Sequence, residues 1–106
     1  MSDARKIRDF LAMAIRHASR YGRSIEAPAQ ALFGAVFWFK DEEEVVTLKE
    51  MKNAVWVKVR GKSYAICYDA EEQVLEVREK TTQGHRLHAF KERTTASEIW
   101  RAFKGL

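Results

Sequence analysis

The chain has 106 residues, which suits one domain around a single hydrophobic core. Hydrophobic residues make up 46% and charged residues 32%, and the excess of Lys and Arg over Asp and Glu gives a formal charge of +4. This balance is typical of a globular domain and excludes a low-complexity chain, and the single cysteine excludes an internal disulfide and a cysteine-rich metal site.

An amphipathic helix is the first predicted element, and it begins after Ser2 and ends near Gly22. Apolar residues recur there at spacings of three and four, as one face of a helix requires. Ser2 is a suitable N-cap, and Asp3 suits the positive end of the helix dipole. The predicted apolar stripe consists of Ile7, Phe10, Leu11, Ala14, Ile15 and Ala18. A row of arginines lies off that stripe and should face water: Arg5, Arg8, Arg16, Arg20, and Arg23 just after the helix.

Residues 24–40 fit two structures, of which we favour a helix. In the helix, Ser24 is the N-cap, Pro28 lies in the first turn, and the apolar stripe is Ile25, Ala29, Leu32, Phe33, Val36 and Phe37. In the alternative, residues 35–39 form a strand, and the acidic residues 41–44 turn it back into residues 45–48 as a hairpin. Capping-box spacing in residues 47–50 also predicts a short helical turn.

The clearest pattern is an alternating strand over residues 54–60, followed by Gly61-Lys62 as a two-residue type II′ turn. That turn fixes which residues lie opposite one another. On one face it pairs Val59 with Tyr64, Val57 with Ile66 and Val55 with Tyr68. On the other it pairs Trp56 with Cys67, Lys58 with Ala65 and Arg60 with Ser63.

Two more strands and a helix complete the prediction. A loop over residues 70–73 sets Tyr68 opposite Leu75 and Ile66 opposite Val77, and a fourth strand over residues 85–91 sets Val77 opposite His88 and Leu75 opposite Phe90. Residues 95–98 form a capping box that begins a C-terminal helix. We therefore predict one α+β domain over residues 1–106. It has an N-terminal helix and a second helix, a four-stranded antiparallel meander and a C-terminal helix, with the helices packed on one sheet face.

No set of residues suggests an enzyme, a metal site or a cofactor. His85 and His88 would point to opposite faces of a strand, Cys67 has no neighbouring histidine, and the acids of residues 41–44 point in different directions. The chain has no phosphate-binding glycine loop and no apolar run that could cross a bilayer. We expect a cytoplasmic protein with no membrane contact.

Binding is therefore the favoured function, and the second face of the sheet is the favoured surface. This face combines an aromatic ring with small apolar residues and cations, as protein interfaces do. The predicted interface comprises Trp56, Lys58, Ala65, Cys67, Val74, Leu87 and Ala89. We expect a small non-enzymatic accessory protein that forms a homodimer, or binds another protein, through this face. A small, basic chain without motifs also suits a phage or another mobile element.

Two other functions remain open. The first is nucleic-acid binding by the arginine row of the first helix or by the Trp56 sheet face, since arginines suit phosphates. Its candidate residues are Arg5, Arg8, Arg16, Arg20, Arg23, Lys58, Arg60 and Arg78. The second, which we favour least, is a small-molecule pocket between the helices and the sheet. Its rings would be Phe33, Phe37, Tyr64 and Tyr68, for which a place in the core is the simpler interpretation.

Overall fold

The structure is a computed structural model that describes residues 2–42, 44–48 and 51–106, with the backbone alone at residues 48 and 51–53. It has an α+β fold, as predicted. The elements in chain order are α1 (Asp3–Arg20), α2 (Glu26–Phe39), β1 (Val46–Leu48), β2 (Met51–Val59), β3 (Lys62–Asp69), β4 (Val74–Glu79), β5 (Arg86–Phe90) and α3 (Ala96–Lys104). None of the described helices is both long and apolar enough to cross a bilayer.

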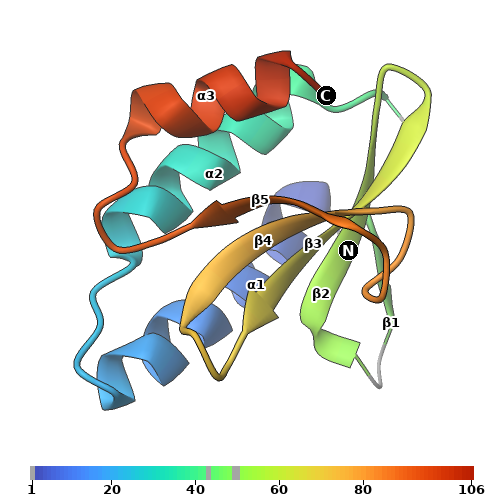
Figure 1. Ribbon diagram of the computed structural model, residues 1–106. Helices are drawn as coiled ribbons and strands as arrows, with labels where there is room; N and C mark the ends of the chain where they lie inside the picture. The colour runs from blue at the N-terminus through green and yellow to red at the C-terminus, as the bar shows by residue number, and fades with distance from the viewer. Residues whose placement is uncertain (1, 43, 49–50) are drawn as a thin grey trace.

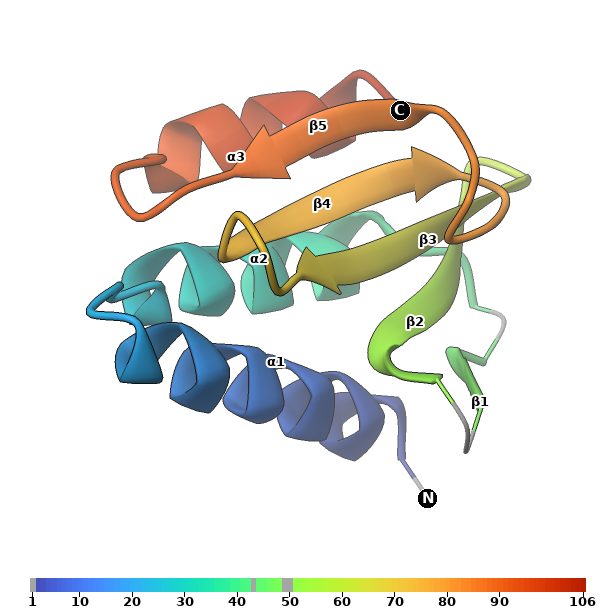
Figure 2. The ribbon, with the colours of Figure 1, turned by 60° about the horizontal axis from the view of Figure 1, so that its bottom comes forward.

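The strands form one antiparallel sheet in the order β1-β2-β3-β4-β5, and the three helices lie on one side of it (Figure 1). In Figure 2 strands β3 to β5 lie in front of the helices, so the other face of the sheet has no helix over it. The packing of the helices on one sheet face is thus confirmed. The sheet has five strands and not four, because β1 pairs with β2 through Val46 opposite Trp56.

The added strand also replaces the predicted helical turn, since residues 46–48 are extended. Val45, just before β1, is buried against the core, and this burial overrides the capping signal of Thr47. The remaining two residues of that predicted turn, 49–50, lie outside the described residues. The helical interpretation of residues 24–40 is confirmed, and the alternative hairpin over residues 34–48 is wrong.

Helix α1 has the predicted cap, with the Ser2 hydroxyl oxygen accepting a hydrogen bond from the Arg5 amide at 3.2 Å. Its predicted stripe faces the sheet, and Ile7, Phe10, Leu11, Ala14 and Ala18 are buried. Only Ile15 stays half-buried, at the edge of the stripe next to α2. The periodicity of an amphipathic helix was therefore enough to find the core side of α1.

Helix α2 has a different core side from the predicted one. Ile25, Ala29, Leu32 and Val36 are buried as expected, together with Pro28 and Ala35. Phe33 is only half-buried and Phe37 is exposed, whereas Tyr64 and Tyr68 are buried in the core, so the pocket predicted among these four rings is not formed. Ser24 is not the N-cap, because Ile25 holds that position, and the Ser24 amide instead donates to the Glu92 carboxylate at 2.9 Å.

The β2–β3 turn consists of Arg60 and Gly61, both with positive φ (52° and 80°), which is a type I′ turn and not the predicted type II′ turn at Gly61-Lys62. The Asp41 carboxylate accepts hydrogen bonds from both turn amides, at 3.0 and 2.8 Å, and so stabilises this choice. The true pairs differ from the predicted ones by two residues, with Trp56 opposite Ala65 and Val55 opposite Ile66. A shift of two leaves the strand residues on their predicted faces. Arg60, predicted on the face of Trp56, instead lies in the turn, and its guanidinium reaches α3 on the helix side.

The other predicted pairs are correct. Tyr68 lies opposite Leu75, and Val77 lies opposite both Ile66 and His88. A bulge between Val77 and Arg78 then places Arg86 opposite Arg78. Helix α3 has the predicted capping box, in which the Thr95 hydroxyl accepts from the Glu98 amide and the Glu98 carboxylate accepts from the Thr95 amide.

Candidate interaction surfaces

The first candidate surface is the face of the sheet that has no helix over it, here called the outer sheet face. It carries most of the predicted interface, because Trp56 lies opposite Ala65, and Cys67 and Ala89 both lie opposite Glu76. Lys58 and Val74 alternate onto the same face. Leu87 does not belong to it: next to the β4–β5 bulge its side chain packs against the main core, and this part of the prediction was wrong.

The apolar centre of the outer sheet face is closed by side chains of the sheet itself. Ala54, Ala65 and Cys67 are buried, and the half-buried ring of Trp56 packs against them. Val74 is buried as well. The small residues at the centre of this face are therefore covered within one chain, and the apolar surface still in water belongs to the half-exposed Val46, Trp56 and Ala89.

Next to this cluster lies a buried carboxylate, Glu76, which is 3% exposed. The Arg78 guanidinium donates to both of its oxygens, at 3.2 and 3.0 Å, and also to the Gly84 carbonyl at 3.0 Å. The Arg86 Nε atom lies 2.9 Å from Glu76 Oε2 without the alignment of a hydrogen bond. A second nitrogen of Arg86, Nη2, pairs with Glu72 at 2.9 Å. Two arginines thus neutralise the one charge that the sheet buries here.

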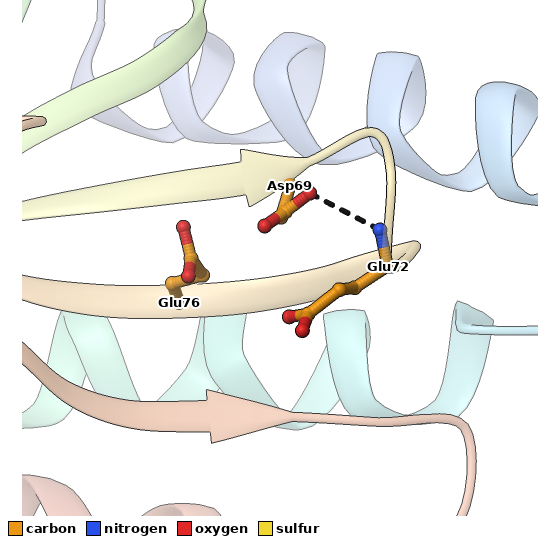
Figure 3. A group of neighbouring side chains, drawn as sticks. All are labelled: Asp69, Glu72 and Glu76. Carbon is orange, nitrogen blue, oxygen red and sulfur yellow. Dashed lines mark hydrogen bonds between the residues drawn. The ribbon is translucent and has the colours of Figure 1, made fainter.

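Glu76 also belongs to an acidic group that the sequence analysis missed. Figure 3 shows Asp69, Glu72 and Glu76 around the β3–β4 hairpin, and the nearest oxygens lie within 4.8 Å of one another. Asp69 accepts hydrogen bonds from the Glu71 and Glu72 amides at 2.9 and 3.1 Å, and the two glutamates are paired with arginines. Because these oxygens already have donors and cations, we assign no metal ion to the group.

Two of the arginines predicted to contact nucleic acid from the sheet have other roles. Arg60 donates to the Leu106 carbonyl at 2.8 Å and to the Phe103 carbonyl at 3.4 Å, and so binds the carbonyl end of α3. Its guanidinium also lies 5.8 Å from the centre of the Phe39 ring. Arg78 donates hydrogen bonds to Glu76, and these bonds raise the pKa of Arg78 further above the ordinary arginine value. These two cations stabilise the fold.

The arginine row of α1 is the second candidate surface, and it is as predicted. Its members are all exposed: Arg5, Arg8, Arg16, Arg20 and, after the helix, Arg23. Among the residues that the structure describes, the only ion pair of this row joins Arg8 to Asp9, at 3.9 Å and in full contact with water.

The third candidate surface was not predicted, and we call it the aromatic surface. Trp38 near the end of α2 is 74% exposed and lies 6.0 Å, centre to centre, from Trp100 of α3. Phe37 is 37% exposed and lies 5.0 Å from Phe33. Gly34 lies beside the Trp100 ring, which would be in ordinary van der Waals contact, at 3.8 Å, with a Cβ at that position. The aromatic surface thus comprises Phe33, Gly34, Phe37, Trp38 and Trp100, on two helices that lie side by side (Figure 1).

Three described side chains of types used in covalent or proton-transfer chemistry lie in or against the sheet. Burial, and then the nearby Glu76 charge, raise the pKa of the Cys67 thiol to about 11, so the thiolate is scarce at neutral pH. His17 Nδ1 lies 2.8 Å from the Tyr68 hydroxyl, and that phenol is buried beneath α1. His88 faces Val77 and lies beside Phe90.

Comparison with known proteins places the chain in a family. No curated protein matches it. The sequence profile of one family, described as "integron cassette protein VCH_CASS1 chain", matches residues 5–100, from the first turn of α1 into α3. The match therefore covers the whole sheet and the helices that carry the aromatic surface. The chain belongs to this family of integron cassette proteins.

Proposed function

We propose that this integron cassette protein is a non-catalytic interaction protein that associates with a second copy of itself through the aromatic surface. One observation carries the proposal: Trp38 is 74% exposed on a helix that is apolar on nearly every side. A helix of that composition is normally covered all round, and a contiguous aromatic surface is typical of an interface. The family match agrees with an accessory protein of a mobile element.

The aromatic surface is a better interface than the sheet face that the sequence favoured. The apolar centre of the outer sheet face is filled by Trp56. The edge strand β5 carries Arg86 and a bulge, and both features oppose pairing with a strand of another copy. On the aromatic surface, by contrast, the rings of Phe37 and Trp38 have water on one side.

The shape of α2 suits an antiparallel contact between two copies. The exposed residues of its first half are the small Ala27 and the polar Glu26 and Gln30, with Ala31 and Gly34 half-exposed beside them. The large, exposed rings of Phe37 and Trp38 follow in its last turn. A two-fold axis across the middle of the helix would place the rings of one copy over the small residues of the other. Apolar, aromatic-rich contacts of this kind are typical of homodimers.

Sedimentation velocity over a wide range of concentrations tests this function. We expect a dimer of the wild-type chain, and at least about tenfold weaker association in Trp38→Ser, because an exposed aromatic at an interface centre is a typical hot spot. Val46→Ser is the matched control, since Val46 is half-exposed on the outer sheet face opposite Trp56. A monomeric wild-type chain, or dissociation by Val46→Ser and not by Trp38→Ser, would contradict the proposal.

Nucleic-acid binding by the arginine row of α1 is the second candidate function. The observation in its favour is the exposure of all five arginines, with one weak ion pair among them in the part of the chain described. Binding to random duplex DNA at low salt would fall steeply as salt rises, and the double variant Arg16→Gln, Arg20→Gln would reduce that slope by about 2. Lys62→Gln, on the sheet side, is the control. Undetectable binding at low salt would exclude this candidate.

A further inference from the structure

Residues of α1 and α2 line an open groove that includes the Phe33 ring. Its volume is about 310 Å³, within the range of small-molecule sites. The walls are almost wholly apolar and are formed by Leu11, Ala12, Ile15, Ala29 and Phe33. The hollow exists because Ala12 and Ala29 are small at a place where two helices meet.

The polar groups of the groove are few and lie at its mouth. Arg8 and Gln30 are the two polar residues in its lining, and both are exposed. The Arg8 side chain is 69% exposed, and its carboxylate neighbour Asp9 is 3.9 Å away and equally hydrated. An ion pair of that kind binds weakly, so the guanidinium can exchange it for another anion. Gln30 makes one long hydrogen bond, at 3.4 Å, to Glu26.

We propose that this groove binds an anionic amphiphile, a molecule with one short alkyl chain and a carboxylate or similar head group. The alkyl chain would lie over Ala12, Ile15 and Phe33, which are half-exposed, so that binding removes their apolar surface from water. The head group would lie at Arg8, whose guanidinium presents two parallel donors to a carboxylate. Arg5, one turn earlier on the same helix, adds positive potential at that end.

The positive charge of Arg8 should favour an anionic ligand over a neutral or a cationic one. Arg8 is the one charged residue of the lining, and the acids next to the groove, Asp9 and Glu26, lie outside the lining. A neutral amphiphile would gain the apolar contacts and lose the ion pair, and a cationic one would meet like charge. Decanoate, decanol and decylamine have the same alkyl chain and differ in the head group, so they separate the two contributions.

Titration of the full-length chain with sodium decanoate below its micellar concentration, followed by amide chemical shifts in NMR, tests the site. We expect saturable shifts centred on Ala12 and Phe33. Decanol should bind about tenfold more weakly than decanoate, the magnitude of one charge-assisted hydrogen bond, and decylamine more weakly still. Arg8→Gln should lose about the same factor for decanoate and none for decanol.

Matched variants separate the groove from the rest of α1. Arg16→Gln removes an arginine of the same row outside the groove and should leave decanoate affinity unchanged. Ala12→Phe fills the hollow and should abolish binding of all three probes, with its fold checked by circular dichroism. The titration is repeated in Trp38→Ser, so that the outcome does not depend on self-association. Equal losses in Arg8→Gln and Arg16→Gln, equal affinity for decanoate and decanol, or an absence of saturable shifts would each overturn the proposal.

Discussion

The outer sheet face and the aromatic surface each contain a large aromatic side chain among small residues, yet they differ in what covers it. Trp56 packs against Ala54, Ala65 and Cys67 of its own sheet. Trp38 has one ring neighbour, Trp100, and most of its surface in water. A tryptophan among small residues is therefore packed within the chain on the outer sheet face and mostly exposed to water on the aromatic surface.

The difference arises from the geometry of the two elements. In a sheet, side chains of neighbouring strands stand within a few ångströms of one another, so a tryptophan can lie across the small residues beside it. Around a helix, side chains diverge from the axis, and the outward side of α2 lies between its neighbours α1 and α3. An aromatic residue on such a helix stays exposed unless another molecule covers it.

Removing the charge of Glu76 should have the largest effect on the closed face. Glu76→Gln leaves Arg78 and Arg86 without their shared carboxylate, and breaking a largely buried ion pair costs about 3 kcal/mol. Urea unfolding measures this change. Glu72→Gln is the control, because Glu72 is more than half exposed and should lose less than about 1 kcal/mol. Equal losses in the two variants would mean that burial of Glu76 does not matter.

Removing the ring of Trp56 should have the next largest effect. Trp56→Ala exposes the three small residues beneath it, and we expect a loss of about 2 kcal/mol, below the range for a fully buried tryptophan. The Cys67 thiol, with its pKa raised to about 11, should react slowly with a thiol reagent in the native wild type and much faster in Trp56→Ala. Unchanged reactivity would show that Trp56 does not cover the thiol.

On the helix side of the sheet, the Asp3 carboxylate provides a smaller test of internal ion pairing. Burial would raise its pKa, but the hydrogen bond from the Val45 amide and the Lys40 and Lys6 charges outweigh this and lower the pKa below 3.8. Because the folded pKa is the lower one, the stabilisation is present above the unfolded pKa and is lost as the pH falls below about 4. Asp3→Asn should cost about 1 kcal/mol near neutral pH and should then lose less stability in acid than the wild type, because the contribution of Asp3 is already gone. A variant that still lost the same stability in acid as the wild type would contradict this assignment.

The smallest effect on stability should come from Trp38. Trp38→Ser removes a ring that is mostly in water, so the free energy of unfolding of the monomer should change by less than about 0.5 kcal/mol. The contrast with Trp56→Ala is the direct measure of how the two surfaces differ. A Trp38→Ser chain as unstable as Trp56→Ala would show that the aromatic surface belongs to the core of one chain.

The sheet could be predicted from the sequence further than the helices could. Alternation assigned residues 54–59 to their correct faces, even though the turn was placed one residue too late and Arg60 was assigned to the wrong side. Side chains of a strand alternate between the two faces with a period of two residues. The error in pairing was also two residues, so it did not move any strand residue to the other face. What the pattern could not include was Asp41, which lies in a different part of the chain and fixes the turn at Arg60 and Gly61.

Helix α2 shows where sequence reasoning fails. Phe33 and Phe37 fit an apolar stripe as well as Leu32 and Val36 do, because α2 is apolar around nearly its whole circumference. Periodicity finds a core side only when the other side is polar. The same limit applies to charge: Arg60 and Arg78 look like phosphate contacts until their carbonyl and carboxylate partners are known. The low amphipathicity of α2 was itself the available sign of an exposed apolar surface.

The two hydrogen bonds that the β2–β3 turn donates to Asp41 have a practical consequence for engineering this chain. The tip of a hairpin is ordinarily a tolerant place to cut, insert or permute a protein. Here the tip depends on a carboxylate that follows α2 and on Arg60, which also binds the last turn of α3. An insertion between Arg60 and Gly61 would therefore break the hydrogen bonds that join this turn to Asp41 and to the end of α3. The β3–β4 loop is the safer place for a reporter or a new terminus. Its hydrogen bonds, from two loop amides to Asp69 and from the Gln73 side chain to the Ala70 carbonyl, join residues that are close in sequence.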